Sequence, residues 1–148
     1  MGSRYMIVDG HSVIFAWPEL HKLHRNDPGK ARDVLVRRLE ELSDASFWKV
    51  TVVFDGRSSS RSSFVPREGV EVWYTRGQES ADSLIEAMVA QAPAPTELVV
   101  VTADQGERCL VEGLGAFCVS PDWLRMEWES SRQALEQRLQ QVHRRARW

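Results

Sequence analysis

The sequence alternates short apolar runs with amphipathic segments along most of its 148 residues. A short, almost continuous apolar run bounded by turn residues is typical of a strand that is buried on both faces. Such runs predict strands over residues 5–9, 50–54, 70–75, 97–102 and 116–119. Because helical segments separate them, the pattern predicts an α/β fold: a three-layer sandwich with a central, mainly parallel sheet of about five strands and a C-terminal helix.

The segments between the predicted strands carry apolar residues at helical spacing and recognisable helix ends. Asp27-Pro28 predicts an N-cap followed by proline at the first helical position, and this helix runs to about Ser43. Ser80 is expected to cap a second helix that ends before Pro93. The remaining expectations are a helical turn over residues 13–17, a mobile loop over 56–63, a helix from 104 and a helical C-terminus after 121.

Length and composition indicate one domain. A chain of this size buries an ordinary core, and 43% apolar with 27% charged residues excludes both a disordered and a fibrous class. We assign residues 1–148 to a single domain, with 126–148 as a helical basic C-terminal extension. No apolar run approaches the roughly 20 residues of a membrane span, and the N-terminus lacks an apolar signal region. We therefore expect a cytoplasmic protein with no membrane contact; its oligomeric state stays open.

Acidic residues stand at the ends of the predicted strands. Asp9 and Asp55 follow the first two strands directly, Asp104 stands just after the fourth, and Asp82 begins the helix after the third. Ligands of an open parallel sheet bind outside the carboxyl ends of its strands, so we expect these carboxylates to meet at one edge. Carboxylate oxygens suit Mg²⁺, which can activate a water for attack on a phosphodiester.

Each of these acids also has a purely structural interpretation. Asp9 can cap the helix that follows it, and Asp55-Gly56 is a common turn pair. Asp82 lies in a first helical turn, where a carboxylate complements the helix dipole. Asp104 and Glu107 together look like a capping box. The repetition of acids at successive strand ends is harder to explain by local structure and favours a shared cation.

Charge is unevenly distributed, although the net charge is only −2. Residues 79–112 carry seven acids and one arginine, a local balance of −6, whereas the segments 56–67 and 132–148 are basic. An acidic centre flanked by basic segments is what a metal-dependent nuclease needs, and an ordinary solvated surface is the alternative. No GxxxxGK[ST], GxGxxG or GxSxG motif is present, which disfavours nucleotide-driven enzymes, dehydrogenases and serine hydrolases.

Contacts with single-stranded RNA are expected from basic and aromatic residues around this centre. His11, beside Asp9, is a candidate for touching substrate, with a packed or turn histidine as the alternative. The basic candidates are Lys22, Arg25, Arg57, Arg61 and Arg67. The candidates for base stacking are Trp17, Trp48 and Trp73, although we expect at least two of the three to be buried in the core.

Four motifs together resemble the YacP-like branch of the NYN/PIN-like ribonucleases. They are Ile7-Val8-Asp9-Gly10-His11, Val53-Phe54-Asp55-Gly56, the block from Glu79 to Glu86 (Glu-Ser-Ala-Asp-Ser-Leu-Ile-Glu) and Val101-Thr102-Ala103-Asp104. Order and spacing match over roughly residues 4–125. The resemblance implies a PIN-like sheet, a Mg²⁺ or Mn²⁺ site and endonucleolytic cleavage of single-stranded RNA. By match to the motifs, Asp9, Asp82 and Asp104 would be metal-site carboxylates and Asp55 an auxiliary one. Some relatives act on mRNA in association with the ribosome.

Ser12 is the main departure from the family pattern, which has asparagine at this position. In the family, the asparagine amide helps to order the site and a substrate or metal-bound water. Serine keeps a hydroxyl but is shorter and lacks the two-headed amide. Ser12 makes one rival function credible, a non-catalytic RNA- or ribosome-binding module of the same fold. A phosphoryl-transfer enzyme for small phosphate esters is disfavoured, because it would need a covalent aspartate with a second acid two positions on, which Asp9-Gly10-His11 does not offer. A toxin-like nuclease with an inhibitor partner stays open.

Overall fold

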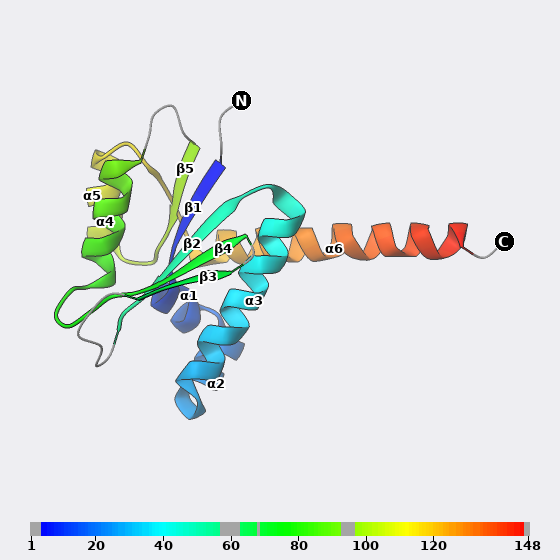
Figure 1. The fold of residues 1–148 in the computed structure, drawn as a ribbon, viewed down its shortest axis with the longest axis horizontal. Helices are drawn as coiled ribbons and strands as arrows, with labels where there is room; N and C mark the ends of the chain where they lie inside the picture. The colour runs from blue at the N-terminus through cyan, green and yellow to red at the C-terminus, as the bar shows by residue number, and fades with distance from the viewer. Residues whose placement is uncertain (1–3, 57–62, 68, 93–96, 147–148) are drawn as a thin grey trace.

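The computed structural model describes residues 4–56, 63–67, 69–92 and 97–146, in which strands and helices alternate (Figure 1). The strands are β1 (Arg4–Asp9), β2 (Lys49–Phe54), β3 (Ser63–Arg67), β4 (Val70–Tyr74), β5 (Glu97–Val101) and β6 (Phe117–Val119). The helices are α1 (Gly10–Ala16), α2 (Pro18–Asn26), α3 (Pro28–Ser46), α4 (Ala81–Gln91), α5 (Gln105–Gly113) and α6 (Pro121–Arg145). The predicted α/β class is confirmed.

The strands form one sheet in the order β3-β4-β2-β1-β5-β6. All neighbours except β3 and β4 are parallel, and β1 lies at the centre, with Asp9 beside Val53 of β2 and Val8 beside Val101 of β5. The five parallel strands are those that the sequence predicts. Because they are parallel, their carboxyl ends lie at one edge of the sheet.

The edge strand β3 is absent from the sequence-based prediction. We expected a loop over residues 56–63, of which 57–62 lie outside the described part of the chain. Residues 63–67 pair antiparallel with β4, Ser63 opposite Tyr74 and Arg67 opposite Val70. The local composition has no period that signals a strand. These residues form a strand because they pair with β4; strand formation depends strongly on the neighbouring strands and not only on local sequence.

Helices cover both faces of the sheet, as a three-layer sandwich requires (Figure 1). α1, α2, α3 and α6 cover one face, where Ile14, Leu35 and Leu124 are buried. α4 and α5 cover the other face with Ile85 and Val111. Successive residues of β1 therefore pack into one layer or the other, which explains why its apolar run is continuous.

Burial decides the role of two tryptophans. Trp17 and Trp48 are only 1% and 2% exposed, so the burial expected for at least two of the three candidates is confirmed, and these two rings are not available to stack on a base. The Trp17 indole Nε1 donates a hydrogen bond to the carbonyl of Pro121 at 2.9 Å, and its ring stacks on Trp128 with centroids 6.0 Å apart. The stacking role of Trp73, which is half-buried, stays a prediction.

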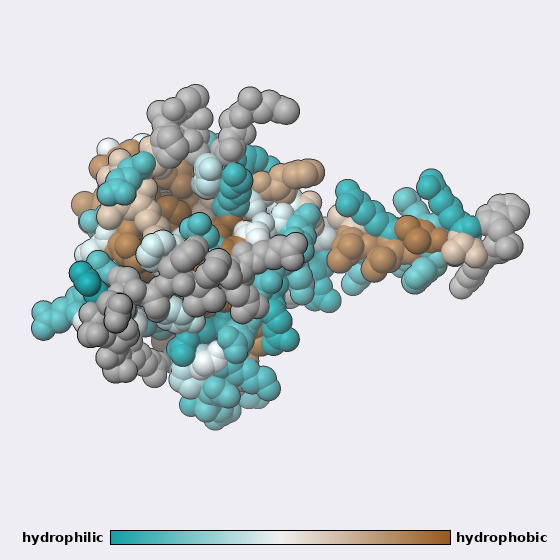
Figure 2. Space-filling model, viewed as in Figure 1, coloured by the Kyte–Doolittle hydropathy of each residue, from teal (hydrophilic) through white to brown (hydrophobic). Residues whose placement is uncertain are grey.

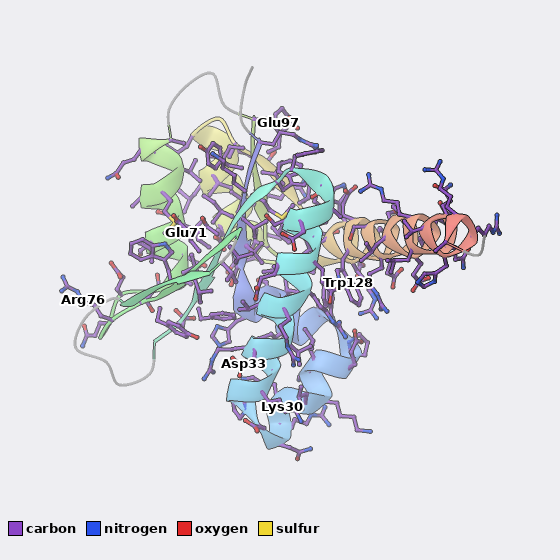
Figure 3. The ribbon with its side chains drawn as sticks, turned by 45° about the vertical axis from the view of Figure 1, so that its right-hand side comes forward. Lys30, Asp33, Glu71, Arg76, Glu97 and Trp128 are labelled. Carbon is purple, nitrogen blue, oxygen red and sulfur yellow. The ribbon has the colours of Figure 1, made fainter. Side chains whose placement is uncertain are left out.

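The long helix α6 begins in the core and projects away from it (Figures 1 and 3). Trp128 is 7% exposed and donates its Nε1 proton to Glu41 Oε2 at 3.0 Å. Farther along, Leu135, Leu139 and Val142 lie exposed among polar and basic residues, visible as brown atoms on the projecting helix (Figure 2). Although α6 has 25 residues, no helix in the described ranges combines the length and apolarity that a membrane span needs.

Ending the chain after Arg132 is expected to leave the fold intact. Almost every described side chain beyond this point is exposed, so its removal takes little apolar surface out of the core. We expect the free energy of unfolding, from urea titration, to change by less than about 0.5 kcal/mol. As a control, Trp128→Ala is expected to cost about 3–5 kcal/mol. A truncated chain that is destabilised as much as Trp128→Ala would show that the projecting segment belongs to the folded unit.

Candidate metal centre

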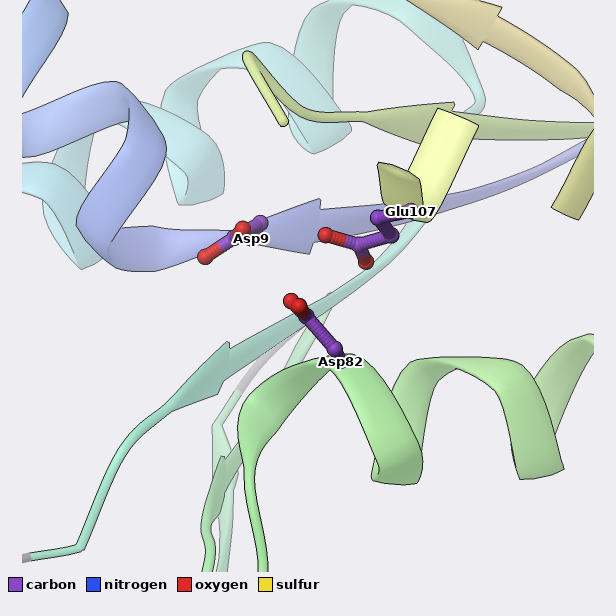
Figure 4. Close-up of side chains that lie close together, drawn as sticks. All are labelled: Asp9, Asp82 and Glu107. Atoms are coloured by element: carbon purple, nitrogen blue, oxygen red, sulfur yellow. The ribbon is translucent and has the colours of Figure 1, made fainter. Parts of the chain in front are cut away.

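Three carboxylates from separate parts of the chain converge at the carboxyl edge of the sheet. Asp9 ends β1, Asp82 lies in the first turn of α4 and Glu107 in the first turn of α5. Each offers an oxygen, and these oxygens lie within 4.8 Å of one another. Figure 4 shows the three side chains pointing toward a common point between β1, α4 and α5. Asp9 and Glu107 are buried, and Asp82 is half-buried.

Asp9 both ends β1 and caps α1. Its Oδ2 accepts a hydrogen bond from the Ser12 hydroxyl at 2.8 Å, and its Oδ1 accepts one from the Ser12 backbone N–H at 3.5 Å. The chain must turn directly after the strand, and glycine is needed there because a Cβ on Gly10 would overlap the ring of Phe54. The capping and site interpretations of Asp9 therefore apply together.

Asp55 holds α4 in place and lies outside the three-carboxylate cluster. Its Oδ1 accepts a hydrogen bond from the backbone N–H of Ala81 at 2.8 Å, at the first residue of α4. Ser80 caps the same helix end by accepting from Ser83 N–H at 3.1 Å. These two bonds fix the helix whose second residue is Asp82. Asp55 therefore holds the start of the helix that carries Asp82, and its auxiliary role at a metal site stays a prediction.

Asp104 lies outside the three-carboxylate cluster, whose third member is Glu107, and a ligand role for Asp104 stays a prediction. Asp104 is the N-cap of α5: its Oδ1 accepts from the N–H groups of Gly106 and Glu107 at 2.8 and 3.1 Å. Its side chain is exposed, whereas Glu107 is 2% exposed and faces Asp9 and Asp82. The cap uses Oδ1 of Asp104, and the turn of helix that it starts carries Glu107 inward.

Thr102 connects the cluster, and sequence reasoning missed it together with the inward position of Glu107. The Thr102 hydroxyl lies 2.9 Å from Glu107 Oε2 and 3.3 Å from Asp9 Oδ2, and it accepts from Asp104 N–H at 3.1 Å. A hydroxyl has one proton, so it donates to one carboxylate at a time. Helical spacing could have predicted the inward position of Glu107, because Glu107 and the buried Val111 are four residues apart and share a face of the helix.

Three carboxyl groups this close together repel one another when ionised, so a positive charge at the cluster would stabilise them. Burial raises the pKa of Glu107 to about 9, with a hydrogen bond to Asp82 and the charge of Asp9 acting in the same direction. Burial also raises the pKa of Asp9, and the hydrogen bonds from Ser12 oppose this rise. Glu107 Oε1 is buried, and no donor in the described part of the chain reaches it. A proton satisfies this oxygen, and so would a hard divalent cation, which the all-oxygen set fits.

The residues predicted to contact RNA fall into three groups. Ser12 and His11 are half-buried at the site, with the Ser12 hydroxyl engaged by Asp9 and His11 Nδ1 lying 3.8 Å from Asp55 Oδ2. Lys22 and Arg25 are exposed on α2. Arg57, Arg61 and the side chain of Arg67 lie outside the described residues.

Comparisons with known proteins identify the family of this chain. The family model described as the YacP-like NYN domain matches residues 6–148. The Uncharacterized protein YacP of Bacillus subtilis (strain 168) is 34% identical over 140 residues, which are 93% of this chain and 82% of that protein. The chain belongs to the YacP-like NYN domain family.

Solved structures of a relative extend the match to the fold of this YacP-like domain. The crystal structure of Rae1 (YacP) from Bacillus subtilis aligns with a TM-score of 0.82 at 31% identity, covering 96% of this chain and 83% of that one. Its W164L mutant aligns with a TM-score of 0.81 at 32% identity, covering 94% and 82%. The NYN family and the acidic cluster together support a nuclease-like fold with a site that could hold a metal.

Proposed function

We propose that this YacP-like domain is an endoribonuclease that hydrolyses phosphodiester bonds in single-stranded RNA and depends on Mg²⁺ or Mn²⁺. The observation that carries the proposal is the convergence of Asp9, Asp82 and Glu107 within 4.8 Å, with one buried oxygen that no donor among the described residues reaches. Bound there, the cation would lower the pKa of a water and stabilise charge on the phosphate.

Hydrogen bonds within the chain hold the three carboxylates in the positions that this chemistry needs. Ser12 and Thr102 hold the carboxylates of Asp9 and Glu107, and Asp55 fixes the start of α4 behind Asp82. Hydrogen bonds of this kind orient metal-ligating carboxylates, and their loss typically costs 10–100-fold in metal affinity or activity. Ser12 therefore keeps the ordering part of the role that the family gives to asparagine.

We infer RNA as the substrate class from exposed basic residues and from the family resemblance. Lys22 and Arg25 expose basic groups on α2, the helix that follows α1 at the site, and they suit a phosphate backbone. We include mRNA on the ribosome, in the cytoplasm, in the proposal because that context belongs to the family resemblance. Its partners would then be the RNA and, for some substrates, the ribosome.

The proposal is tested with a labelled single-stranded RNA and with the same RNA closed into a circle. We expect Mg²⁺ or Mn²⁺ to support cutting of both forms, and EDTA to abolish it, because the cluster then has no cation. Cutting of the circle establishes an endonuclease, and Asp9→Asn serves as the inactive control. Cutting that survives both EDTA and Asp9→Asn would defeat the metal-site assignment.

A second candidate is a non-catalytic RNA-binding module of the same fold. It is favoured by Ser12, whose hydroxyl is engaged by Asp9 and which has no amide to offer to a substrate or a water. It predicts RNA binding without cutting in Mg²⁺, and binding that Asp9→Asn leaves unchanged. The cleavage assay above separates the two candidates.

A further inference from the structure

A group of four rings lies beside the acidic cluster on α1 and α2. We call it the ring cluster; its members are His11, Phe15, His21 and His24. Phe15 is 49% exposed, although its neighbours Val13 and Ile14 on α1 are fully buried. Phe15 is therefore an aromatic side chain that the core leaves open to solvent, and its place next to the candidate site needs an explanation.

The neighbouring rings hold Phe15 in place without covering it. His21 and His24 meet it edge-on, with ring centroids 5.2 and 5.0 Å away and interplanar angles of 81° and 66°. His11 lies at 6.1 Å with its ring nearly parallel, at 27°. A side chain already fixed by its neighbours loses little conformational freedom when a ligand stacks on it, which favours binding.

His11 links the ring cluster to the residues around the candidate metal centre. His11 is two residues after Asp9, and its Nδ1 accepts a hydrogen bond from the Asp55 backbone N–H at 3.5 Å. His11 also packs edge-on against Phe54, at the end of β2. Phe15 follows one helical turn later, about 9 Å along the helix axis from Asp9. A strand of RNA with a phosphate at the acidic cluster can therefore reach Phe15 with a neighbouring nucleotide.

Charge around the ring cluster suits a nucleic acid. Burial lowers the pKa of His11, the charges of Asp55 and Asp9 oppose this, and those of His24 and Arg32 add to it. Arg32 on α3 is thus close enough for its charge to act on His11, and α2, which carries His21 and His24, also exposes Lys22 and Arg25. Basic side chains around an open aromatic ring are the combination that single-strand binders use, the bases stacking while the cations follow the backbone.

We propose that Phe15 is a stacking platform for an unpaired base of the RNA, next to the bond that is cut. The proposal rests on the proposed function and adds a substrate requirement to it: the nucleotide beside the cleaved phosphate must be unpaired. It assigns no base identity, because every base has a face that can stack. Helical RNA, with its bases stacked on one another, cannot meet this requirement.

Three variants of Phe15 and one matched control test the platform by fluorescence anisotropy with labelled single-stranded RNA in EDTA, where no cation is available. We expect Phe15→Ala to weaken binding by roughly five- to 150-fold and Phe15→Leu to weaken it similarly, because leucine keeps apolar bulk but has no ring. Phe15→Trp should bind at least as well as the original chain. The control is Phe117→Ala, a 70% exposed ring on the edge strand β6, and it should bind like the original chain.

A second series of RNAs identifies the base that stacks on Phe15. RNAs that lack one base at a time should show one position at which the missing base and Phe15→Ala weaken binding no more together than either does alone. Circular dichroism shows whether each variant is folded. If Phe15→Ala does not fold, the RNA binding of Phe15→Leu and Phe15→Trp tests the platform. Binding by Phe15→Leu equal to that of the original chain, or equal losses in Phe15→Ala and Phe117→Ala, would overturn the platform. Absence of cutting in Mg²⁺ alongside these binding losses would instead overturn the proposed function and leave the platform standing.

Discussion

Glu107→Gln is expected to abolish RNA cleavage as fully as Asp9→Asn or Asp82→Asn, each by on the order of 100-fold or more. Each change removes a negative oxygen from the cluster in which the three side chains lie within 4.8 Å. The measurement is the single-turnover cleavage rate at saturating protein, over a titration of Mg²⁺. If a variant is slow because it binds the cation more weakly, we expect its cleavage rate to recover in part at high Mg²⁺.

Asp104→Asn is the matched control for this set. Asparagine caps helices about as well as aspartate, so the bonds to Gly106 and Glu107 N–H and the start of α5 are kept while the charge is removed. We expect cleavage to stay within about tenfold of the original rate, because Asp104 lies outside the cluster. The opposite result, an inactive Asp104→Asn beside an active Glu107→Gln, would return the ligand role to Asp104 and show that α5 shifts when the cation binds.

The same Glu107→Gln change is expected to stabilise the metal-free protein at alkaline pH. The folded-state pKa of Glu107 is about 9, above the ordinary 4.5 that it regains on unfolding, so the folded chain binds an extra proton between these values. Stability from this group is full below about pH 4.5 and falls as pH rises toward 9, with a slope of at most about 1.4 kcal/mol per pH unit. Glutamine has no charge to bury, so its variant should gain roughly 1–3 kcal/mol at pH 8.

Urea unfolding in EDTA between pH 6 and pH 9 measures this effect. Because the pKa of Glu107 in the folded state is about 9, Glu107→Gln should flatten the pH dependence over this range. Excess Mg²⁺ should raise the stability of the original chain at pH 8 and leave that of Glu107→Gln nearly unchanged, because a cation binds the folded state only. The control is Glu136→Gln on the exposed part of α6. A pH dependence identical in the original and Glu107→Gln chains would show that Glu107 is ionised in the fold.

Local sequence determines the framework of this protein. The five parallel strands, the caps at Asp27 and Ser80 and the placement of Asp9 follow from patterns within a few residues of chain. A run of apolar residues that ends in Asp-Gly predicts a strand followed by a sharp turn from local residues alone. Parallel pairing then brings the strand ends to one edge, which is why Asp9 and Asp82 could be placed at one site.

Only the tertiary structure decides which side chains complete the site. Asp104 and Glu107 are three residues apart on one helix, and the docking of α5 on the sheet turns one outward as a cap and the other inward. The pairing of β3 with β4 and the exposure of Phe15 beside a buried Trp17 are decided in the same way. The physical reason is that local patterns specify which residues form a helix or strand, whereas burial and contact depend on elements distant in the sequence.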